Sequence, residues 1–159
     1  MAIAYSGSEV VEIAVQIEIC GQAYYEAAIA NARSDKARDI FAYLREEEKR
    51  HAKIFREMLP QMGDVEAPWR DNEDYVNYMH ALAENRVFPT PDAAREAVRG
   101  LPDDASAIRY ALGFEKDTIL FFYELRSIVR DKDQAVIDEL IEEERGHIRQ
   151  LNELLKAVS

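Results

Sequence analysis

The positions of proline divide this chain into two long stretches that can each form uninterrupted helices. All five prolines of the 159 residues lie from Pro60 to Pro102. Proline lacks a backbone N–H and its ring blocks the interior of a helix, so the stretches on either side lack the strongest helix breaker. We therefore expect long helices on both sides of a broken middle region.

Each proline-free stretch has the pattern of a helical hairpin. Apolar residues recur every three to four positions, and a polar turn interrupts the stretches near Arg33 and near Arg130. The predicted helices span residues 8–31, 36–59, 105–129 and 133–157. The sequence shows no sustained alternation of apolar and polar residues, so no sheet is expected.

The middle region, residues 60–104, is too long to be a structureless loop in a compact domain. Residues 72–85 and 92–99 have short helical patterns. Two hairpins joined by such a connection are typical of a four-helix bundle with a crossover. We therefore predict an all-α fold, a four-helix bundle of two helical hairpins joined by a long, partly helical crossover, in a single domain over residues 1–159.

Charge and cysteine content exclude several classes of protein. The net charge of −11 leaves no basic surface for nucleic acid or for an anionic membrane. No apolar run approaches the roughly 18 residues of a membrane-spanning helix, and the first residues lack a secretory signal pattern. Cys20 is the single cysteine, which excludes an intrachain disulfide or a four-cysteine iron site. We expect a cytoplasmic protein that binds neither nucleic acid nor membranes.

One glutamate interrupts the apolar stripe of each predicted long helix. These residues are Glu18, Glu48, Glu115 and Glu144. A carboxylate on a buried stripe costs free energy unless a partner compensates its charge. Two of the four begin Glu-x-x-His segments, which end at His51 and His147. Residues i and i+3 of a helix share a face, so both members of each pair can reach a metal ion.

The same spacing occurs in both hairpins. Glu48 follows Glu18 by 30 residues, and Glu144 follows Glu115 by 29 residues. In an antiparallel pair with a central turn, such groups lie at the same height. Four carboxylates balance two divalent cations, and oxygen-rich ligands with one imidazole per metal favour iron or manganese. The alternatives are buried, hydrogen-bonded Glu–His pairs without metal, or glutamate runs on solvated faces.

Two tyrosines are candidates for supporting the metal ligands through hydrogen bonds. Tyr25 follows Glu18 by seven residues, and Tyr123 follows Glu115 by eight. Either hydroxyl could donate to a ligating carboxylate. The alternative is that both tyrosines are aromatic residues of the core or of an interface.

Several segments of the chain match a pattern known from one group of proteins. They are Glu18 with Tyr25, Glu48–Lys53, Gly113–Asp117 with Phe121–Tyr123, Glu142–His147, and Ala81–Phe88 in the crossover. This pattern resembles the rubrerythrin-like branch of the ferritin-like superfamily. The resemblance implies a ferritin-like fold and a non-haem di-iron centre with two iron ions, which manganese or zinc could replace.

The resemblance also implies roles for six side chains. Glu48 and Glu144 would bridge or chelate the irons. Glu18 and Glu115 would be terminal carboxylate ligands. His51 and His147 would supply one imidazole to each iron. The implied activity is that of an oxidoreductase that reduces hydrogen peroxide or oxygen; the alternatives are a ferroxidase or iron-handling protein, and a metal-bearing helical module without turnover.

The chain departs from the rubrerythrin pattern in two ways. Rubrerythrins proper carry a four-cysteine rubredoxin-like domain, which a single cysteine rules out here, so we expect electrons from a separate donor such as a rubredoxin-like protein. They also have a second glutamate three residues from the third-helix ligand, where this chain has Leu112 and Thr118. The remaining six ligands are similar to those of bacterioferritin-type ferroxidase centres. We expect a homodimer, in which the hairpins could be swapped between chains.

Overall fold

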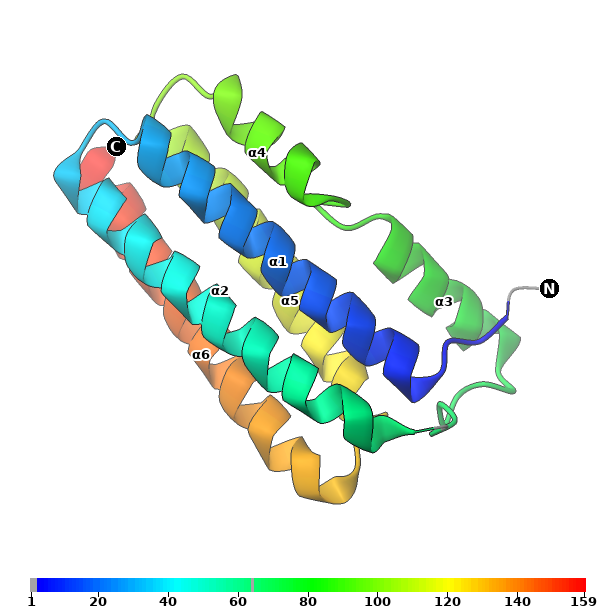
Figure 1. Ribbon diagram of the computed structural model, residues 1–159. Helices are drawn as coiled ribbons and strands as arrows, with labels where there is room; N and C mark the ends of the chain where they lie inside the picture. Colours follow the sequence, from blue (N-terminus) through cyan, green and yellow to red (C-terminus); the bar gives the residue numbers. More distant parts are fainter. Residues whose placement is uncertain (1–2, 64) are drawn as a thin grey trace.

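The computed structural model describes residues 3–63 and 65–159, and its regular secondary structure is helical (Figure 1). Within these residues the helices are α1 (Gly7–Asn31), α2 (Asp35–Met62), α3 (Glu73–Glu84), α4 (Pro91–Arg99), α5 (Asp104–Arg126) and α6 (Asp131–Val158). In the same part of the chain, β structure is limited to an isolated bridge between Ser6 and Glu66. The all-α prediction is therefore confirmed. None of these helices has the length and apolarity needed to cross a membrane.

Polar side chains in the turns begin three of the four long helices. The Ser6 hydroxyl accepts a hydrogen bond from Glu9 N, and the Glu9 carboxylate accepts one from Ser6 N, which completes a capping box before α1. Ser34 and Asp103 cap α2 and α5, and each accepts a hydrogen bond from the N–H three residues later. These bonds satisfy backbone donors that the first turn of a helix leaves free.

α2 is longer than the sequence predicts, because Pro60 does not end it. The helix continues to Met62, and Gly63 ends it with a φ of +53°. Proline removes one backbone donor, but so close to the end of a helix only the last turn is affected. Glycine adopts a left-handed φ without a steric clash, which explains why the chain turns at this residue.

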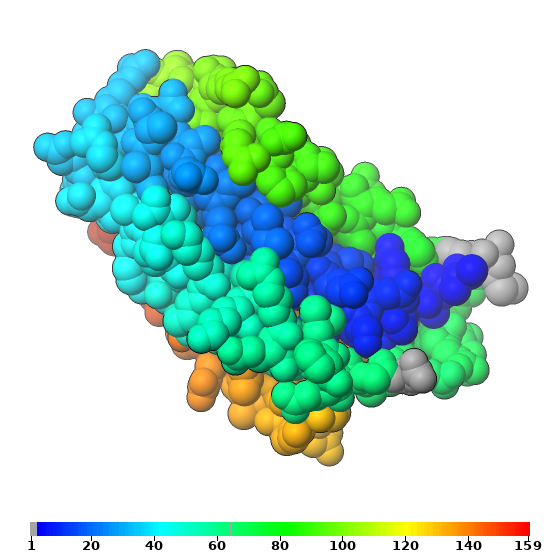
Figure 2. All heavy atoms as spheres, in the orientation of Figure 1, coloured from blue at the N-terminus to red at the C-terminus, as the bar shows by residue number. Residues whose placement is uncertain are grey.

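The four long helices form a bundle, and the crossover lies along one side of it (Figure 1). α1 packs against α2 and α5, and α6 packs against α5 and α2. The crossover helices α3 and α4 lie alongside α1, and α4 packs directly on it. Figure 2 shows α1 lying between this crossover and α2 on one face of the molecule. The two antiparallel hairpins and the long crossover together give the predicted ferritin-like bundle.

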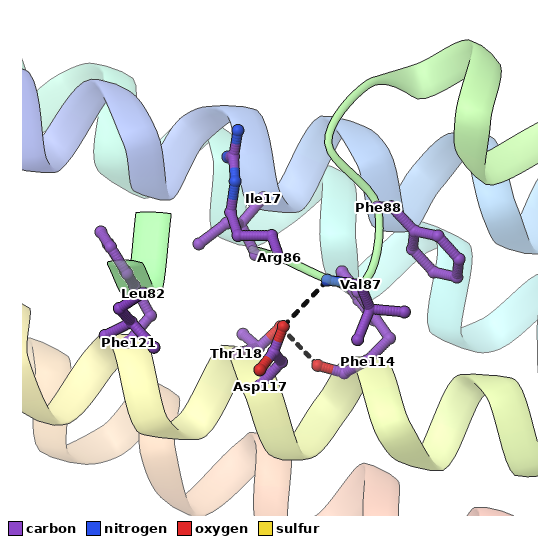
Figure 3. A pocket seen from close by; sticks show the side chains of 9 residues that line it. All are labelled: Ile17, Leu82, Arg86, Val87, Phe88, Phe114, Asp117, Thr118 and Phe121. Atoms are coloured by element: carbon purple, nitrogen blue, oxygen red, sulfur yellow. Dashed lines mark hydrogen bonds between the residues drawn. The ribbon is translucent and has the colours of Figure 1, made fainter. Parts of the chain in front are cut away.

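The segment between α3 and α4 fastens the crossover over the seam between α1 and α5. Phe88 stacks on Tyr24 of α1 at a ring-centroid distance of 4.8 Å and on Phe114 of α5 at 5.4 Å. Val87 N donates a hydrogen bond of 3.0 Å to Asp117 of α5 (Figure 3). The cavity beside these contacts measures about 10 Å³, which is at the lower limit for one water molecule. The crossover therefore closes this side of the bundle.

Candidate metal centre

The six predicted ligands come together inside the bundle, one from each of α1 and α5 and two from each of α2 and α6. They are Glu18, Glu115, Glu48, His51, Glu144 and His147. The four carboxylates and the His51 side chain have no exposed surface, and His147 is 2% exposed. One chain supplies all six side chains, so the cluster needs no residue from a partner chain.

The six side chains form two groups that share two members. In each group, one donor atom per residue lies within 4.8 Å of the others. The first group is Glu18, Glu48, His51 and Glu144, and the second is Glu48, Glu115, Glu144 and His147. Glu48 and Glu144 belong to both groups. Each of these carboxylates can therefore direct one of its oxygens towards the first group and the other towards the second.

Glu144 lies between the two imidazole rings. Its Oε1 is 2.8 Å from His51 Nδ1, and its Oε2 is 2.7 Å from His147 Nδ1. The rings are nearly parallel, with centroids 5.7 Å apart. Glu18 Oε2 lies 3.5 Å from His51 Nδ1, and Glu115 Oε2 lies 3.7 Å from His147 Nδ1. Each ring therefore presents Nδ1 to the shared carboxylate and to one further carboxylate.

The cluster contains buried polar atoms whose hydrogen-bonding capacity is not used. Among the described residues, no group with hydrogen-bond geometry reaches either carboxylate oxygen of Glu18, Glu48 or Glu144, or Nδ1 of either histidine. Folded proteins satisfy nearly all buried polar groups, so this concentration of free donor atoms is typical of a metal site. Four carboxylates and two imidazoles in two overlapping groups fit a pair of iron or manganese ions better than tetrahedral zinc.

Burial changes the protonation of the carboxylates. It raises the pKa of Glu18 and of Glu48 well above the usual range, and repulsion from Glu115 and Glu144 adds to this effect at both carboxyl groups. Burial, with repulsion from Glu144, raises the pKa of Glu115 to about 7. Burial also opposes the ionisation of Glu144, but the two imidazoles outweigh it and lower the pKa of this carboxyl group.

The pKa values of both histidines are also raised, although burial acts on them with the opposite sign. Burial by itself lowers the pKa of an imidazole, but carboxylates outweigh burial at both rings. Glu144 is the main partner that raises the pKa of His51 to about 9, and Glu115 and Glu144 raise that of His147 to about 11. The metal-free cluster therefore holds protons at neutral pH, and divalent cations would displace them because metal ligands bind in their deprotonated form.

Comparison with known proteins identifies the family and the fold of the chain. The family model described as Rubrerythrin matches residues 9–155. The chain belongs to the rubrerythrin family. Among solved structures, a protein from Thermotoga maritima described as a ferritin-like diiron-carboxylate protein has a TM-score of 0.72 and 23% sequence identity, and the match covers 98% of each chain. That likeness shows the ferritin-like fold. No curated protein matches the sequence.

In this member of the rubrerythrin family, α5 brings one carboxylate, Glu115, to the cluster. Thr118, three residues later, is buried, and its hydroxyl donates a 3.0 Å hydrogen bond to the backbone oxygen of Phe114. Leu112, three residues earlier, is partly buried in the apolar core. Neither side chain is a carboxylate, so the cluster keeps six candidate ligands.

Tyr25 contacts the cluster, but Tyr123 does not. The Tyr25 hydroxyl donates a hydrogen bond to Oε1 of Glu115 across the bundle, and not to Glu18 of its own helix. Burial and the Glu115 carboxylate raise the pKa of Tyr25 well above its usual value. Tyr123 is 46% exposed and accepts a hydrogen bond from Arg145. Its predicted role at the cluster is therefore wrong: eight residues rotate a helix about 80° past two full turns, which turns Tyr123 away from the face of Glu115.

Sequence reasoning did not assign a role to Gly21. A Cβ atom at this position would lie 2.7 Å from Glu48 Oε2 and 2.8 Å from the ring of Phe114. The missing side chain thus leaves room for a carboxylate of the cluster and for the ring that the crossover packs against. The available signal was its spacing, since Gly21 follows Glu18 by three residues and shares its face.

Arg50 and Glu143 are two further residues that the sequence prediction missed. Both contact His51 on the side away from the cluster: Glu143 Oε2 lies 2.9 Å and Arg50 Nη2 lies 3.3 Å from His51 Nε2. Each directly adjoins a predicted ligand in the sequence, Arg50 before His51 and Glu143 before Glu144. In a chain rich in charged residues, that adjacency alone does not separate them from solvated neighbours.

Proposed function

We propose that this protein is a non-haem di-iron oxidoreductase that reduces hydrogen peroxide, or oxygen, with electrons from a separate donor. The observation that carries the proposal is the buried cluster of four carboxylates and two imidazoles, arranged as two groups with two shared carboxylates. Membership of the rubrerythrin family supports an oxidoreductase of the di-iron class. The reaction of peroxide consumes two electrons and two protons and gives two molecules of water.

The two groups of the cluster define two metal positions. Glu18 and His51 belong to the first position, Glu115 and His147 belong to the second, and the shared carboxylates lie between them. When bound, a pair of ferrous ions supplies two electrons, one from each ion, and Lewis acidity towards the oxidant. The residues of the chain fix the separation of the two positions, and the ligands lose their protons when the cations bind.

The residues around the cluster control water and protons. The Tyr25 hydroxyl holds a proton against Glu115 Oε1, inside a core that excludes solvent. Phe41 and Tyr24 pack around the Tyr25 ring, with ring centroids 6.0 Å and 5.5 Å from it. A hydroxyl held in this way orients the carboxylate for metal binding, and it is a proton donor close to the site where the oxidant is reduced.

The partners of the reaction follow from the composition of the chain. The single cysteine cannot form a four-cysteine electron-transfer centre, so we propose a separate carrier such as a rubredoxin-like protein. We also propose a cytoplasmic homodimer. Because each chain contains a complete cluster, dimerisation would serve stability or access rather than the supply of ligands.

One observation favours a second function, that of a ferroxidase or iron-handling protein. A groove of about 410 Å³ lies outside the cluster and has His147 in its wall. Four glutamates line it: Glu47, Glu139, Glu142 and Glu143. Arg149 also lines the groove, and arginines pair with three of its four glutamates, so it keeps only a small negative charge to attract cations. The direct connection to a buried ligand is what suits the uptake of ferrous iron.

Anaerobic loading followed by oxidation tests these functions. We expect the protein to bind about two ferrous ions per chain, and one equivalent of hydrogen peroxide to oxidise both rapidly while the iron stays bound. Repeated cycles with an added one-electron donor would establish turnover. Uptake far beyond this stoichiometry in the presence of oxygen would favour iron handling instead. If peroxide oxidised the iron no faster than in a Glu48→Ala/His147→Ala variant, the protein would be a metal-bearing helical module without turnover.

A further inference from the structure

The two histidines are placed alike towards the cluster but differently on their outer edges. Both rings direct Nδ1 to Glu144. On the outer edge, His51 Nε2 lies 2.9 Å from Oε2 of Glu143. His147 Nε2 is buried and has no hydrogen-bond partner among the described residues. The cluster is therefore nearly symmetric in its donor atoms and asymmetric in what supports them.

Arg50 holds Glu143 against His51. The Nη2 atom of Arg50 lies 2.5 Å from Glu143 Oε2 and 2.9 Å from Glu47 Oε2. One guanidinium group therefore joins α2 to α6 and pairs with two carboxylates. Charge-assisted hydrogen bonds of this kind are stronger and more directional than neutral ones, so the carboxylate that meets His51 is held in place although its side chain is 38% exposed.

The second hairpin cannot make the same contact. Gly146 precedes His147, whereas Arg50 precedes His51. Glu47, which stands before its metal-ligand glutamate as Glu143 does, is bound by Arg50 and makes no hydrogen bond to His147 within the described residues. The asymmetry thus originates in a single sequence position, where one Glu-x-x-His segment has arginine and the other has glycine.

Glu47, His51 and Glu143 place donor atoms close enough together to hold a metal ion, but the chemistry of the group is against it. Arg50 already forms ion pairs with both carboxylates. When His51 Nδ1 faces a cation in the cluster, Nε2 carries the ring proton and donates it to Glu143. These side chains therefore act on His51 and are not ligands of a third ion.

We propose that Arg50 and Glu143 are positioning residues that make the two metal positions unequal; this inference rests on the metal binding of the proposed function. Glu143 fixes the His51 ring with its Nδ1 lone pair towards the cluster and makes it a stronger donor. His147 has no such support, and it lines the acidic groove. The position at His51 fills first and retains its ion, and the position at His147 exchanges with the solution.

Cobalt titration of the full chain tests this order without depending on redox activity. Metal-free protein is titrated with Co²⁺ in competition with a chelator, and we expect two steps whose dissociation constants differ by about tenfold or more. Glu143→Gln removes the charged acceptor and should weaken the tighter step by about 10- to 100-fold, with little change in the looser step. At one equivalent of Co²⁺, the proton NMR spectrum should show one shifted imidazole N–H signal, which exchanges faster in this variant.

Glu142→Gln is the matched control. Glu142 adjoins Glu143, lines the same groove and pairs with Arg145 and Arg149 at the surface. The variant removes the same charge without touching His51, so both steps should keep their wild-type affinities. Thermal unfolding of the metal-free proteins checks that both variants fold, and Glu143→Gln should unfold at a slightly lower temperature because it loses an ion pair with Arg50.

Two results would overturn the inference. One is a wild-type protein with two equal steps; the other is an equal loss of affinity in Glu142→Gln and Glu143→Gln, which would assign the effect to the charge of the groove. Either leaves the proposed function standing. A protein that binds no Co²⁺ at all would overturn both the proposed function and the inference.

Discussion

Gly21 of α1 and Glu48 of α2 are in contact because position 21 has no side chain. A Cβ atom added at Gly21 would lie 2.7 Å from Glu48 Oε2, which is closer than non-bonded atoms approach, and 2.8 Å from the ring of Phe114. The Glu48 carboxylate, which belongs to both groups of the cluster, therefore has room only because the neighbouring helix has no side chain at position 21. This relationship joins helix packing to ligand geometry at one residue.

Gly21→Ala should displace the Glu48 carboxylate and the Phe114 ring. We expect a loss of about 1–3 kcal/mol in the free energy of unfolding from overpacking, and weaker cobalt binding by about tenfold or more. Gly113→Ala is the control, since nothing lies within 4 Å of a Cβ at this helical position in α5. That variant should gain about 0.5–1 kcal/mol and bind metal normally. Equal behaviour of the two variants in cobalt titration would contradict the role of Gly21.

Tyr25→Phe should affect the metal position at His147. Loss of the hydroxyl leaves Glu115 Oε1 buried without its donor, so we expect the looser cobalt step to weaken by about tenfold and peroxide reduction to slow. Tyr123→Phe removes a hydroxyl that is exposed on the same bundle and bonded to Arg145. It should leave both measurements unchanged. Equal effects of Tyr25→Phe and Tyr123→Phe on cobalt binding and peroxide reduction would show that the Tyr25 hydrogen bond does not support the site.

Glu18→Gln should stabilise the metal-free protein while it weakens metal binding. The variant removes one of four carboxylates from a site without exposed surface, where burial of charge costs free energy. We expect urea unfolding in the presence of a chelator to show a gain of about 1–3 kcal/mol at neutral pH. In excess Co²⁺ the wild type should be more stable than Glu18→Gln, because it gains more free energy of unfolding from bound metal. A metal-free variant less stable than the wild type would be evidence against an electrostatically strained cluster.

Asp104→Asn should destabilise the protein in a pH-dependent way. The carboxylate of Asp104 accepts hydrogen bonds of 2.9 Å from the backbone N–H groups of Arg33 and Ser34. Burial opposes its ionisation, but these donors outweigh burial and lower the pKa of Asp104. Its contribution is therefore present above the unfolded-state pKa and is lost as the pH falls through the lower, folded-state pKa.

We expect Asp104→Asn to cost about 2 kcal/mol at pH 7, and the difference from the wild type to shrink below about pH 4. Urea unfolding at a series of pH values measures it. Asp92→Asn changes a solvent-exposed aspartate of α4 and should have little effect at any pH. If the difference in unfolding free energy between Asp104→Asn and the wild type did not depend on pH, the stabilisation would not come from the negative charge of the carboxylate.

The sequence predicts those parts of the site that depend on one helix at a time. Glu18 and Glu115 are recognisable because a charge interrupts an apolar stripe, and His51 and His147 because each follows a glutamate by one turn. Antiparallel pairing then brings these residues to one height. The same reasoning identifies Tyr25 as a donor to a ligating carboxylate, but it does not show that this carboxylate, Glu115, lies on another helix.

The other parts of the site depend on contacts between helices, which the spacing of residues along one helix does not reveal. Gly21 matters because of atoms on α2 and α5, and Glu143 matters because Arg50 reaches it from α2. Pro60 is exposed and removes one backbone donor close to the end of the helix, so α2 runs on to Met62. Local preference is a weak guide wherever tertiary contacts decide the outcome.

The crossover makes two sides of the bundle different. It covers the seam between α1 and α5, the helices that each bring a lone carboxylate, through Phe88 and Val87. The helices that carry the imidazoles, α2 and α6, meet along a seam where Arg50 and Glu143 stand at the surface. For the proposed function, we expect ions and electrons to approach from this side, which the crossover leaves uncovered.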